Sequence, residues 1–289
     1  MPNEQIKLSE PRRFSRRHFI TAAIAVPALT ALYTWRVEPH WLEFVHRDLP
    51  IANLPPLLVG RRLVQLSDLH IGPQVDDDYI IETFRRVAAL QPDIVVHTGD
   101  LVTYHREQTI EQARRVLVHF PRGLLGSVAI LGNHDYGRSW ADARIAASVE
   151  QLLTAAGATV LRNARTTIAG LHVVGLDDLW AGRFSLEAAF RSFDFNQPAL
   201  VLSHNPDTCD LPGWPRYDGW ILAGHTHGGQ CKPPFLPPPL LPVRNKRYTS
   251  GEFSLSGGRQ LYISRGVGHL LRVRFNVRPE IPVFRLVRA

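Results

Sequence analysis

Cysteine is nearly absent from this chain of 289 residues, which contains only two. At most one intramolecular disulfide bond can therefore form, and it requires the loops of Cys209 and Cys231 to approach each other in an oxidising compartment. Free thiols are the default expectation. The sequence also shows no internal repeat, which excludes a repeat architecture.

Positive charge is in excess but is not concentrated along the chain. The formal net charge is +7 at pH 7, which by itself favours binding to nucleic acids or other anionic surfaces. Most of the arginines are dispersed, so we expect no specific nucleic-acid partner. The surplus charge instead favours anionic lipid or polymer surfaces. The densest basic cluster lies near the N-terminus and consists of Arg12, Arg13, Arg16 and Arg17.

The N-terminal apolar run is short of the roughly 20 residues that an ordinary membrane span needs. It extends from Phe19 to Leu32, or 14 residues, a length typical of the apolar region of a signal peptide. Because Arg16 and Arg17 directly precede it, the segment resembles a twin-arginine export signal. A buried amphipathic helix is the alternative. Cleavage stays open, since the small-x-small segment Ala23 to Ala25 lies early in the run.

Five short apolar runs, each followed by side chains that could bind a metal, are the most informative feature of the sequence. Such runs, rich in β-branched residues and bounded by Gly, Asp or Asn, predict strands buried on both faces. Functional groups in open α/β sheets collect at the carboxyl ends of the strands, so residues far apart in sequence can meet there. The side chains that follow the five runs are Asp68 and His70, Asp100, Asn133, His204, and His225 and His227.

The residue types in this set predict which metals it binds. A mixture of Asp, Asn and His suits divalent transition metals, whereas an all-oxygen set would suit magnesium or calcium. Seven ligands are too many for one tetrahedral ion. Two ions that share one bridging carboxylate would use all seven and leave positions for water. The set is complete without Cys209 or Cys231, so we do not expect either cysteine to bind zinc.

Helical patterns alternate with the predicted strands in the first two thirds of the chain, which predicts an α/β fold. Apolar residues share one face from Ile80 to Ala88 and again from Ile110 to Phe120. Asp77 and Asp78 are expected to begin the first of these helices. After residue 199 the helical periodicity fades, and residues 248–265 predict two strands joined by a glycine turn. The second half of the core is therefore expected to be rich in antiparallel strands.

Five motifs in order resemble the calcineurin-like metallophosphoesterases. The resemblance covers about residues 60–288, and the segments Tyr262–Gly266 and Arg278–Ile281 are similar to the membrane-associated bacterial phosphodiesterase branch of that family. It implies a four-layer α-β-β-α sandwich in which two mixed sheets pack face to face. The motifs are Asp68-Leu69-His70, Gly99-Asp100, Gly132-Asn133-His134-Asp135, His204 in Ser-His-Asn-Pro-Asp, and Gly224-His225-Thr226-His227.

The resemblance also implies a role for each site residue. Asp100 would bridge two divalent ions, of manganese, zinc or iron, and a metal-bridging hydroxide would attack phosphorus. His134 would contact the phosphate and stabilise or protonate the leaving oxygen. The expected ligands of one ion are Asp68, His70, Asp100 and His227, and those of the other are Asp100, Asn133, His204 and His225.

One position departs from the family pattern. Phosphatases of the family often orient the catalytic histidine with an aspartate three residues after the bridging aspartate, and here that residue is Thr103. Asp135 or a backbone carbonyl could orient His134 instead. Asp177 and Asp178 could belong to a turn or to the site.

The expected function is that of a dinuclear metal-dependent phosphoesterase, in particular a phosphodiesterase. One alternative is a lipid-linked pyrophosphate hydrolase of the UDP-2,3-diacylglucosamine type, and another is a non-catalytic envelope-binding module. The proline-rich segment Lys232 to Pro242 cannot form a central strand or helix. It could form a hydrophobic lip beside the metals, which would favour a lipid substrate, or simply pack over the sheet edge.

These expectations divide the chain into three parts. Residues 1–35 are the signal or N-terminal anchor, residues 36–59 the linker, and residues 60–289 the metallophosphoesterase catalytic domain. With or without cleavage, the catalytic domain is expected outside the bacterial cytoplasmic membrane, in the periplasm or cell wall. A membrane surface is an expected partner in addition to the phosphoester substrate.

Overall fold

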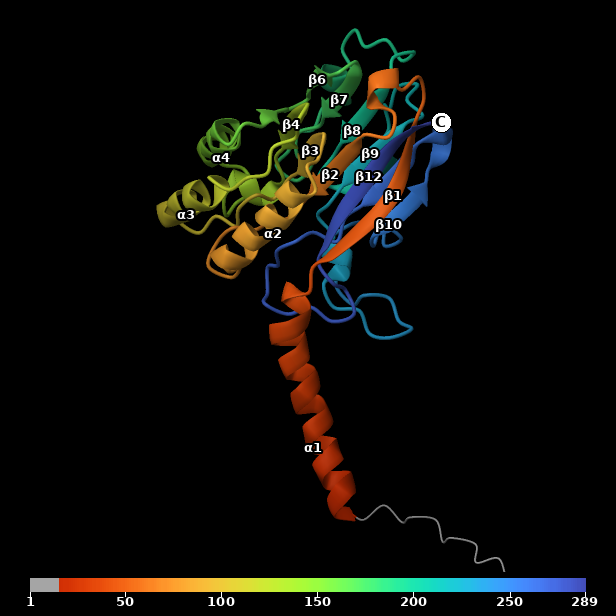
Figure 1. Cartoon of the computed structure of the whole chain (residues 1–289). Coiled ribbons are helices and arrows are strands. Elements are labelled where there is room, and N and C mark those ends of the chain that lie inside the picture. The colour runs from red at the N-terminus through yellow and green to blue at the C-terminus, as the bar shows by residue number, and fades with distance from the viewer. Residues whose placement is uncertain (1–15) are drawn as a thin grey trace, which may run out of the picture.

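Two six-stranded sheets lie face to face in the computed structural model, which describes residues 16–289. Arg12 and Arg13 of the N-terminal basic cluster lie outside the described residues. Helices cover the outer face of the first sheet, and one long N-terminal helix projects from the domain (Figure 1). Two mixed sheets with alternating helices agree with the α/β class that the sequence predicts.

The first sheet carries the first three predicted strand ends. Its strand order is β1-β12-β2-β3-β4-β5. Strands β2 to β5 are parallel, β12 runs antiparallel to β2, and β1 runs parallel to β12. The strands are β1 (Glu43–Ile51), β2 (Arg62–Leu66), β3 (Ile94–Thr98), β4 (Gly126–Ile130), β5 (Thr159–Val160) and β12 (Glu280–Arg288).

The second sheet carries the other two strand ends, in the order β10-β11-β9-β8-β7-β6. The predicted strand, glycine turn and strand are present as the antiparallel pair β10 and β11. The sheet is not rich in antiparallel pairs, however, because β7, β8, β9 and β11 are all parallel. The strands are β6 (Ala164–Ile168), β7 (Leu171–Gly175), β8 (Ala199–Leu202), β9 (Trp220–Ala223), β10 (Gly251–Ser254) and β11 (Gln260–Ile263).

The expectation of an antiparallel-rich second sheet is therefore wrong, because parallel strands are joined here by crossovers that contain almost no helix. Only the four-residue α5 (Leu186–Ala189) and a 3₁₀ turn, Pro206–Asp210, lie in the connections from β7 to β8 and from β8 to β9. Such short elements leave little helical periodicity in the sequence. Parallel alignment is nevertheless what brings the carboxyl ends of β8 and β9 to one edge. Further 3₁₀ turns are Pro56–Leu58, Asn133–Tyr136, His227–Gly229 and Ser256–Gly258.

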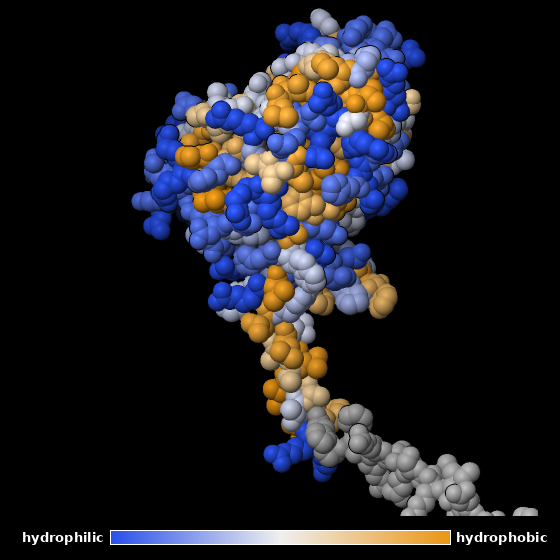
Figure 2. All heavy atoms as spheres, viewed as in Figure 1, coloured by the Kyte–Doolittle hydropathy of each residue, from blue (hydrophilic) through white to orange (hydrophobic). Residues whose placement is uncertain are grey.

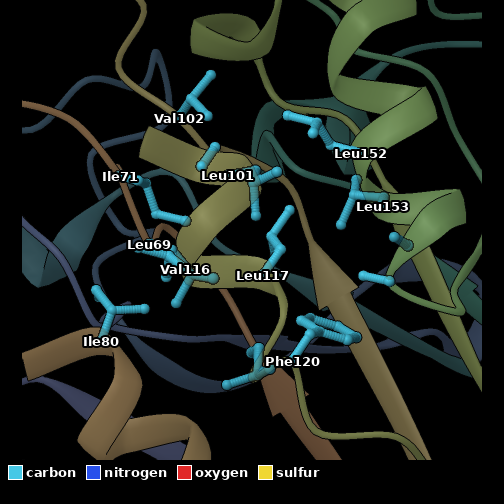
Figure 3. Close-up of a cluster of buried hydrophobic side chains, with 14 of the residues drawn as sticks. Leu69, Ile71, Ile80, Leu101, Val102, Val116, Leu117, Phe120, Leu152 and Leu153 are labelled. Atoms are coloured by element: carbon cyan, nitrogen blue, oxygen red, sulfur yellow. The ribbon is translucent and has the colours of Figure 1, made fainter. Parts of the chain in front are cut away.

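Three amphipathic helices bury their apolar faces on the first sheet. They are α2 (Asp77–Ala89), α3 (Glu107–Leu117) and α4 (Ala143–Ala155). The Asp76 side chain accepts a hydrogen bond from the Asp78 amide and so caps α2, whose first turn holds the two expected aspartates. Figure 3 shows Ile80, Val116, Leu117 and Leu152 converging on Leu69 and Leu101 of the site loops. The helices therefore support the loops at the strand ends.

A second cluster fills the space between the sheets. Leu63, Val96 and Ile130 come from the first sheet and Leu200 and Leu222 from the second, and all are buried. Because strands covered on both faces need apolar residues at every position, their sequences are continuous apolar runs and do not alternate.

The N-terminal helix stands apart from this core. Helix α1 (Arg16–Leu32) continues through a π-helical turn, η1 (Tyr33–Val37), into a 3₁₀ turn, η2 (Glu38–His40). Figure 2 shows that its surface is largely hydrophobic. Among the described residues, Phe19–His40 is the one helical stretch long and apolar enough to cross a membrane. Helical structure thus extends beyond the 14-residue apolar run.

A strand of the first sheet lies within the range expected to be a linker. Strand β1 pairs with β12 along its whole length, from Glu43 opposite Glu280 to Ile51 opposite Arg288. Leu49 and Leu58 are fully buried. Residues 43–58 are therefore part of the folded domain.

We predict that two N-terminal deletions behave differently. Removing residues 1–35 should leave a folded, soluble domain, whereas removing residues 1–59 should unfold it. The second deletion takes away Leu49, Ile51, Leu54 and Leu58, whose burial contributes about 1.5–3 kcal/mol each. That sum is comparable to the roughly 5–15 kcal/mol of a whole domain. Thermal unfolding checks the difference, and equal midpoints would contradict it.

Candidate metal centre

The five predicted strand ends meet at one edge of the paired sheets. Hydrogen bonds between neighbouring strands continue into the loops, from the Asp68 amide to the Gly99 carbonyl (3.0 Å) and from the His70 amide to the Asp100 carbonyl (3.1 Å). The seven predicted ligands are all buried there. Six form two clusters, within each of which the ligand atoms lie within 4.8 Å of one another. The clusters are Asp68, His70 and His227, and Asp100, His204 and His225.

Distances inside the clusters suit tetrahedral ions. Ligand atoms 2.0–2.2 Å from a tetrahedral ion are separated by about 3.3–3.6 Å. His227 Nε2 lies 3.4 Å from Asp68 Oδ1 in the first cluster. In the second, His204 Nε2 lies 3.2 Å from His225 Nδ1. Both clusters can therefore hold an ion of the expected kind.

Asp100 lies between the two clusters. Its Oδ2 atom is 3.6 Å from His70 Nε2 in the first cluster and 3.2 Å from His204 Nε2 in the second. Its other oxygen accepts a hydrogen bond from the His134 amide at 2.9 Å. Asp100 is thus placed where a bridging carboxylate is needed.

The seventh residue, Asn133, has unsatisfied hydrogen-bonding groups in its side chain. Both polar atoms of its side chain are buried, and neither has a hydrogen-bond partner among the described residues. Leaving such groups unpaired costs about 1–3 kcal/mol each. Its amide oxygen is a suitable metal ligand, so an ion would satisfy it.

Hydrogen bonds fix the orientation of the imidazoles. His204 Nδ1 donates to the Thr98 carbonyl (2.8 Å), which leaves Nε2 directed at the cluster. His225 is bound in the opposite sense, because its Nε2 donates to the Pro242 carbonyl (2.8 Å) and leaves Nδ1 free. Partners of this kind set the tautomer of metal-binding histidines.

Thr103 supports His70, and not the catalytic candidate His134. Its hydroxyl oxygen lies 2.8 Å from His70 Nδ1, while His70 Nε2 faces the cluster. Asp135 accepts hydrogen bonds from the Gly132 and Val102 amides instead. Of the described residues, neither Thr103 nor Asp135 is hydrogen-bonded to the His134 ring.

Five of the seven predicted ligands have left-handed backbone conformations. The φ angles are 53° at Asp68, 49° at His70, 56° at Asp100, 71° at His225 and 49° at His227. Each such residue costs about 1–3 kcal/mol and persists only where its surroundings enforce it. Close packing does so here, because a Cβ on Gly132 would lie 2.3 Å from Asp100 Oδ1 and one on Gly224 2.3 Å from Asp68 Oδ2.

Burial and charge shift the pKa values of Asp100, the proposed bridge, and of its neighbour His204 in the metal-free protein. Burial alone raises the pKa of Asp100, but the neighbouring histidines, His204 foremost, hold it well below its usual range. Burial lowers the pKa of His204, but the Asp100 carboxylate outweighs this effect and raises it to about 10. Metal binding must therefore displace a proton from His204, so it strengthens as the pH rises.

Two tryptophans that the sequence did not indicate stand beside the clusters. Trp180 meets His225 edge to face at 4.4 Å, and Trp140 meets His134 at 5.7 Å. The two indoles stack on each other at 5.1 Å. The sequence carries no signal for this contact, because it depends on two loops from different sheets.

The remaining candidates are not among the two clusters. Asp177 accepts hydrogen bonds from Tyr136 and Arg162, which tie the Asn133–Tyr136 turn to the second sheet. Asp178 accepts a hydrogen bond from the Ala181 amide within its own turn. Cys209 and Cys231 do not form a disulfide, and Cys209 is buried whereas Cys231 is half-buried.

Comparison with known proteins agrees with this geometry. The sequence profile of the calcineurin-like phosphoesterases matches residues 61–229. The chain belongs to this family. The two clusters thus correspond to the dinuclear divalent metal centre that the family uses, and the protein is a metal-dependent phosphoester hydrolase.

Three relatives match this chain over nearly its whole length. It is 32% identical to the uncharacterized metallophosphoesterase YkuE of Bacillus subtilis, over 95% of this chain and 98% of the relative. It is 32% identical to phosphodiesterase YaeI of Escherichia coli, over 94% of this chain and 99% of the relative. It is 30% identical to the UDP-2,3-diacylglucosamine pyrophosphatase LpxG of Chlamydia trachomatis, over 92% of this chain and 95% of the relative.

We predict that Thr103→Val weakens metal binding by about ten- to a hundredfold, because His70 loses the partner that holds its ring. Thr103→Ser keeps a hydroxyl at the same place and should bind metal almost as the natural protein does. Isothermal titration of the metal-free proteins with manganese or zinc provides the comparison. Equal affinities for the valine and serine variants would show that the hydrogen bond does not matter.

Proposed function

We propose that the protein is a phosphodiesterase and that its two ions are bound as the sequence predicts. The first ion would be held by Asp68, His70, Asp100 and His227, and the second by Asp100, Asn133, His204 and His225. The position of Asp100 carries the proposal, because one oxygen lies within 3.6 Å of a histidine from each cluster. A 32% identical relative named as a phosphodiesterase supports the reaction.

The protein's own groups would position the substrate and assist the leaving group. When bound, the two ions supply Lewis acidity and the nucleophile for in-line displacement at phosphorus. His134 is half-buried beside His70, at a ring distance of 5.1 Å, and its amide is held by Asp100. It is thus placed to donate a hydrogen bond or a proton to the leaving oxygen. Trp140 limits the movement of its ring.

The substrate side offers room for a large group. Trp140 and Trp180 line a cavity of about 550 Å³ together with Arg244 and Asn245. The aromatic rings can stack on a planar or sugar group, and the guanidinium can pair with a second anionic group. Both features suit a diester better than a small monoester.

A lipid-linked pyrophosphate is the second candidate substrate. The proline-rich loop exposes Phe235, Leu236 and Leu240, and its last carbonyl, that of Pro242, accepts the hydrogen bond from His225. This loop is a hydrophobic lip close to the proposed second ion. The relative named as a UDP-2,3-diacylglucosamine pyrophosphatase is 30% identical, which supports a lipid-linked substrate.

The N-terminal segment is proposed to be a twin-arginine signal that also serves as an anchor. Arg16 and Arg17 are exposed at the start of α1, and the stretch Phe19–His40 is about 33 Å long at a helical rise of 1.5 Å per residue. Because Thr34 and Glu38 at its domain end are bound to the domain, the part left for the bilayer is somewhat shorter than the roughly 30 Å hydrocarbon core. The catalytic domain would then lie outside the cytoplasmic membrane, and residues 60–289 would carry the activity together with the edge strand β1.

A panel of phosphodiesters and phosphomonoesters, assayed with manganese, zinc, iron or magnesium, tests the proposed reaction. We expect diesters to be preferred and transition metals to support turnover better than magnesium. In the same panel, His134→Ala should keep its metal content while kcat falls by about 10²–10⁴. The loss should be smaller with p-nitrophenolate, which needs less protonation as it leaves.

Two outcomes of the panel would contradict the assignment. Preference for monoesters would refute the diesterase. Loss of metal from His134→Ala would make His134 a ligand and not a group that assists the leaving oxygen.

The export proposal predicts the location of a conservative double variant. Replacing Arg16 and Arg17 by lysine keeps the charge but removes the guanidinium pair. Active enzyme should then remain inside the cell, because the twin-arginine route transports folded proteins and would no longer accept this one. Cell fractionation with activity assays checks this. Full export of the double-lysine variant would mean that a general secretory signal or a plain anchor is present.

A further inference from the structure

We infer that the metal-bearing edge of the domain lies against a phospholipid bilayer, an inference that rests on the proposed membrane anchor and phosphodiesterase activity. The occupant of this surface is the headgroup and upper acyl region of the membrane that holds α1. The docking surface consists of Trp35, Trp41, Phe235, Leu236, Leu270 and Leu271, which are all exposed.

Sheet topology places the end of the N-terminal helix at the metal edge. Strand β1 runs parallel to β12, which runs antiparallel to β2, so β1 begins where β2 ends. The pairing agrees with this, because Glu43 at the start of β1 lies opposite Glu280 in β12. The Glu280 amide donates a hydrogen bond to the Gly266 carbonyl, and the next residue, Val267, donates its amide hydrogen to the Ser67 carbonyl directly after β2. Ser67 directly precedes the proposed ligand Asp68. The chain therefore enters the domain at the edge that carries the proposed ligands, and Figure 1 shows α1 meeting the domain at the start of β1.

The connection from helix to domain is packed and is not a free tether. The Arg274 amide donates to the Thr34 carbonyl (2.9 Å) in η1, and the Val277 amide donates to the side chain of Glu38 in η2. Glu38 is only 1% exposed. A helix fixed in this way orients the domain on the membrane, so the edge next to it faces the bilayer.

Two apolar loops extend at the same edge. In the proline-rich loop Phe235 is fully exposed and Leu236 is 58% exposed, and in the loop after β11 Leu271 is 68% exposed. The loops are joined to each other, because the Gln230 side chain donates to the Leu271 carbonyl (2.8 Å) and the Lys232 amide to the Phe275 carbonyl (2.8 Å). Figure 2 shows hydrophobic side chains both along α1 and on the domain next to its base.

Aromatic and basic residues mark the level of the membrane surface. Trp35 and Trp41 flank the domain end of the helical stretch, and tryptophan is enriched at membrane–water interfaces. Arg36 lies over the ring of Trp35 at 4.2 Å, and Arg278 over that of Trp41 at 4.3 Å. These guanidinium groups sit where lipid phosphates would be.

The charge at this edge is complementary to anionic lipid. The segments 31–42, 230–242 and 268–278 contain a single acidic residue, Glu38, which is buried. Their basic residues other than the buried Arg274 are Arg36, Lys232, Arg278 and Arg272, of which Arg272 lies 3.9 Å from the exposed Asp76 and is partly neutralised by it. Basic residues close to an anionic membrane surface are attracted to it. A bilayer therefore fits this edge better than an apolar protein surface would.

In the docked orientation the proposed metal site lies next to the phosphoesters of the membrane lipids. The proline-rich loop ends at Pro242, which binds His225, and begins at Lys232, five residues after His227. The proposed ions thus lie directly behind the membrane-facing loops. Phosphoesters carried by membrane lipids would reach them without leaving the bilayer surface.

Fluorescence quenching in the full-length protein tests the orientation. A fluorophore is attached at Phe235→Cys or, as a control, at Val118→Cys, both with Cys231→Ser, while Cys209 is buried and unreactive. Val118 follows α3, at the opposite end of the first sheet, and is 80% exposed. In vesicles of phosphatidylcholine and phosphatidylglycerol, nitroxide-labelled lipid should quench position 235 at least about twofold more than position 118. Aqueous iodide should quench position 118 preferentially.

Equal lipid quenching at the two positions would overturn the inference. Lipid quenching at position 235 that falls as the protein-to-lipid ratio rises would mean that a second copy displaces the bilayer from the surface, and would also overturn it. Neither result depends on enzymatic activity.

Kinetics separate this inference from the proposed function. Leu270→Ser combined with Leu271→Ser, both outside the proline-rich loop, should lower turnover of a vesicle-embedded p-nitrophenyl phosphatidyl diester by about tenfold and leave a soluble p-nitrophenyl diester unaffected. Val118→Ser combined with Leu124→Ser should change neither. Equal losses on both substrates would contradict docking. No hydrolysis of the soluble diester by the natural protein would refute the diesterase, while the quenching result would still decide the orientation.

Discussion

Burial of two carboxylates beside four histidines is the constraint on which the rest of this structure depends. Asp68 and Asp100 are buried, and burying unpaired charges or polar groups is costly. The site can therefore exist only where cations, backbone amides and histidines offset the cost. The paired sheets provide such a place, because parallel strand ends deliver amides and side chains to one edge.

The same constraint explains features that otherwise seem unrelated. Left-handed backbone at five proposed ligands turns their side chains back toward the centre, and glycines such as Gly132 and Gly224 allow the close approach. The unpaired amide of Asn133 fits the same account, because a bound ion would complete it. Thr103 and the Pro242 carbonyl hold the outer sides of His70 and His225. Each of these features lowers the cost of assembling the proposed metal sites.

Much of this arrangement is predictable from the sequence, and the failures have physical causes. The five strands that precede the ligands are recognisable because burial on both faces demands continuous apolar runs. The direction of β7, β8 and β9 is not, because the crossovers between them contain only very short helical elements and so leave no helical pattern. Strand β1 is hidden by its position at a sheet edge, where Glu43 to Ile51 does not form a continuous apolar run. Thr103, Trp140 and Trp180 act through contacts between loops, which no local pattern records.

The central claim is that one carboxylate, that of Asp100, joins two metal ions into a single centre. Elemental analysis of the purified protein and of Asp100→Ala tests it most directly, with His204→Ala for comparison. We expect about two ions per natural chain, loss of both ions and of turnover in Asp100→Ala, and weakening mainly of the second site in His204→Ala. Two ions retained by Asp100→Ala would contradict the account.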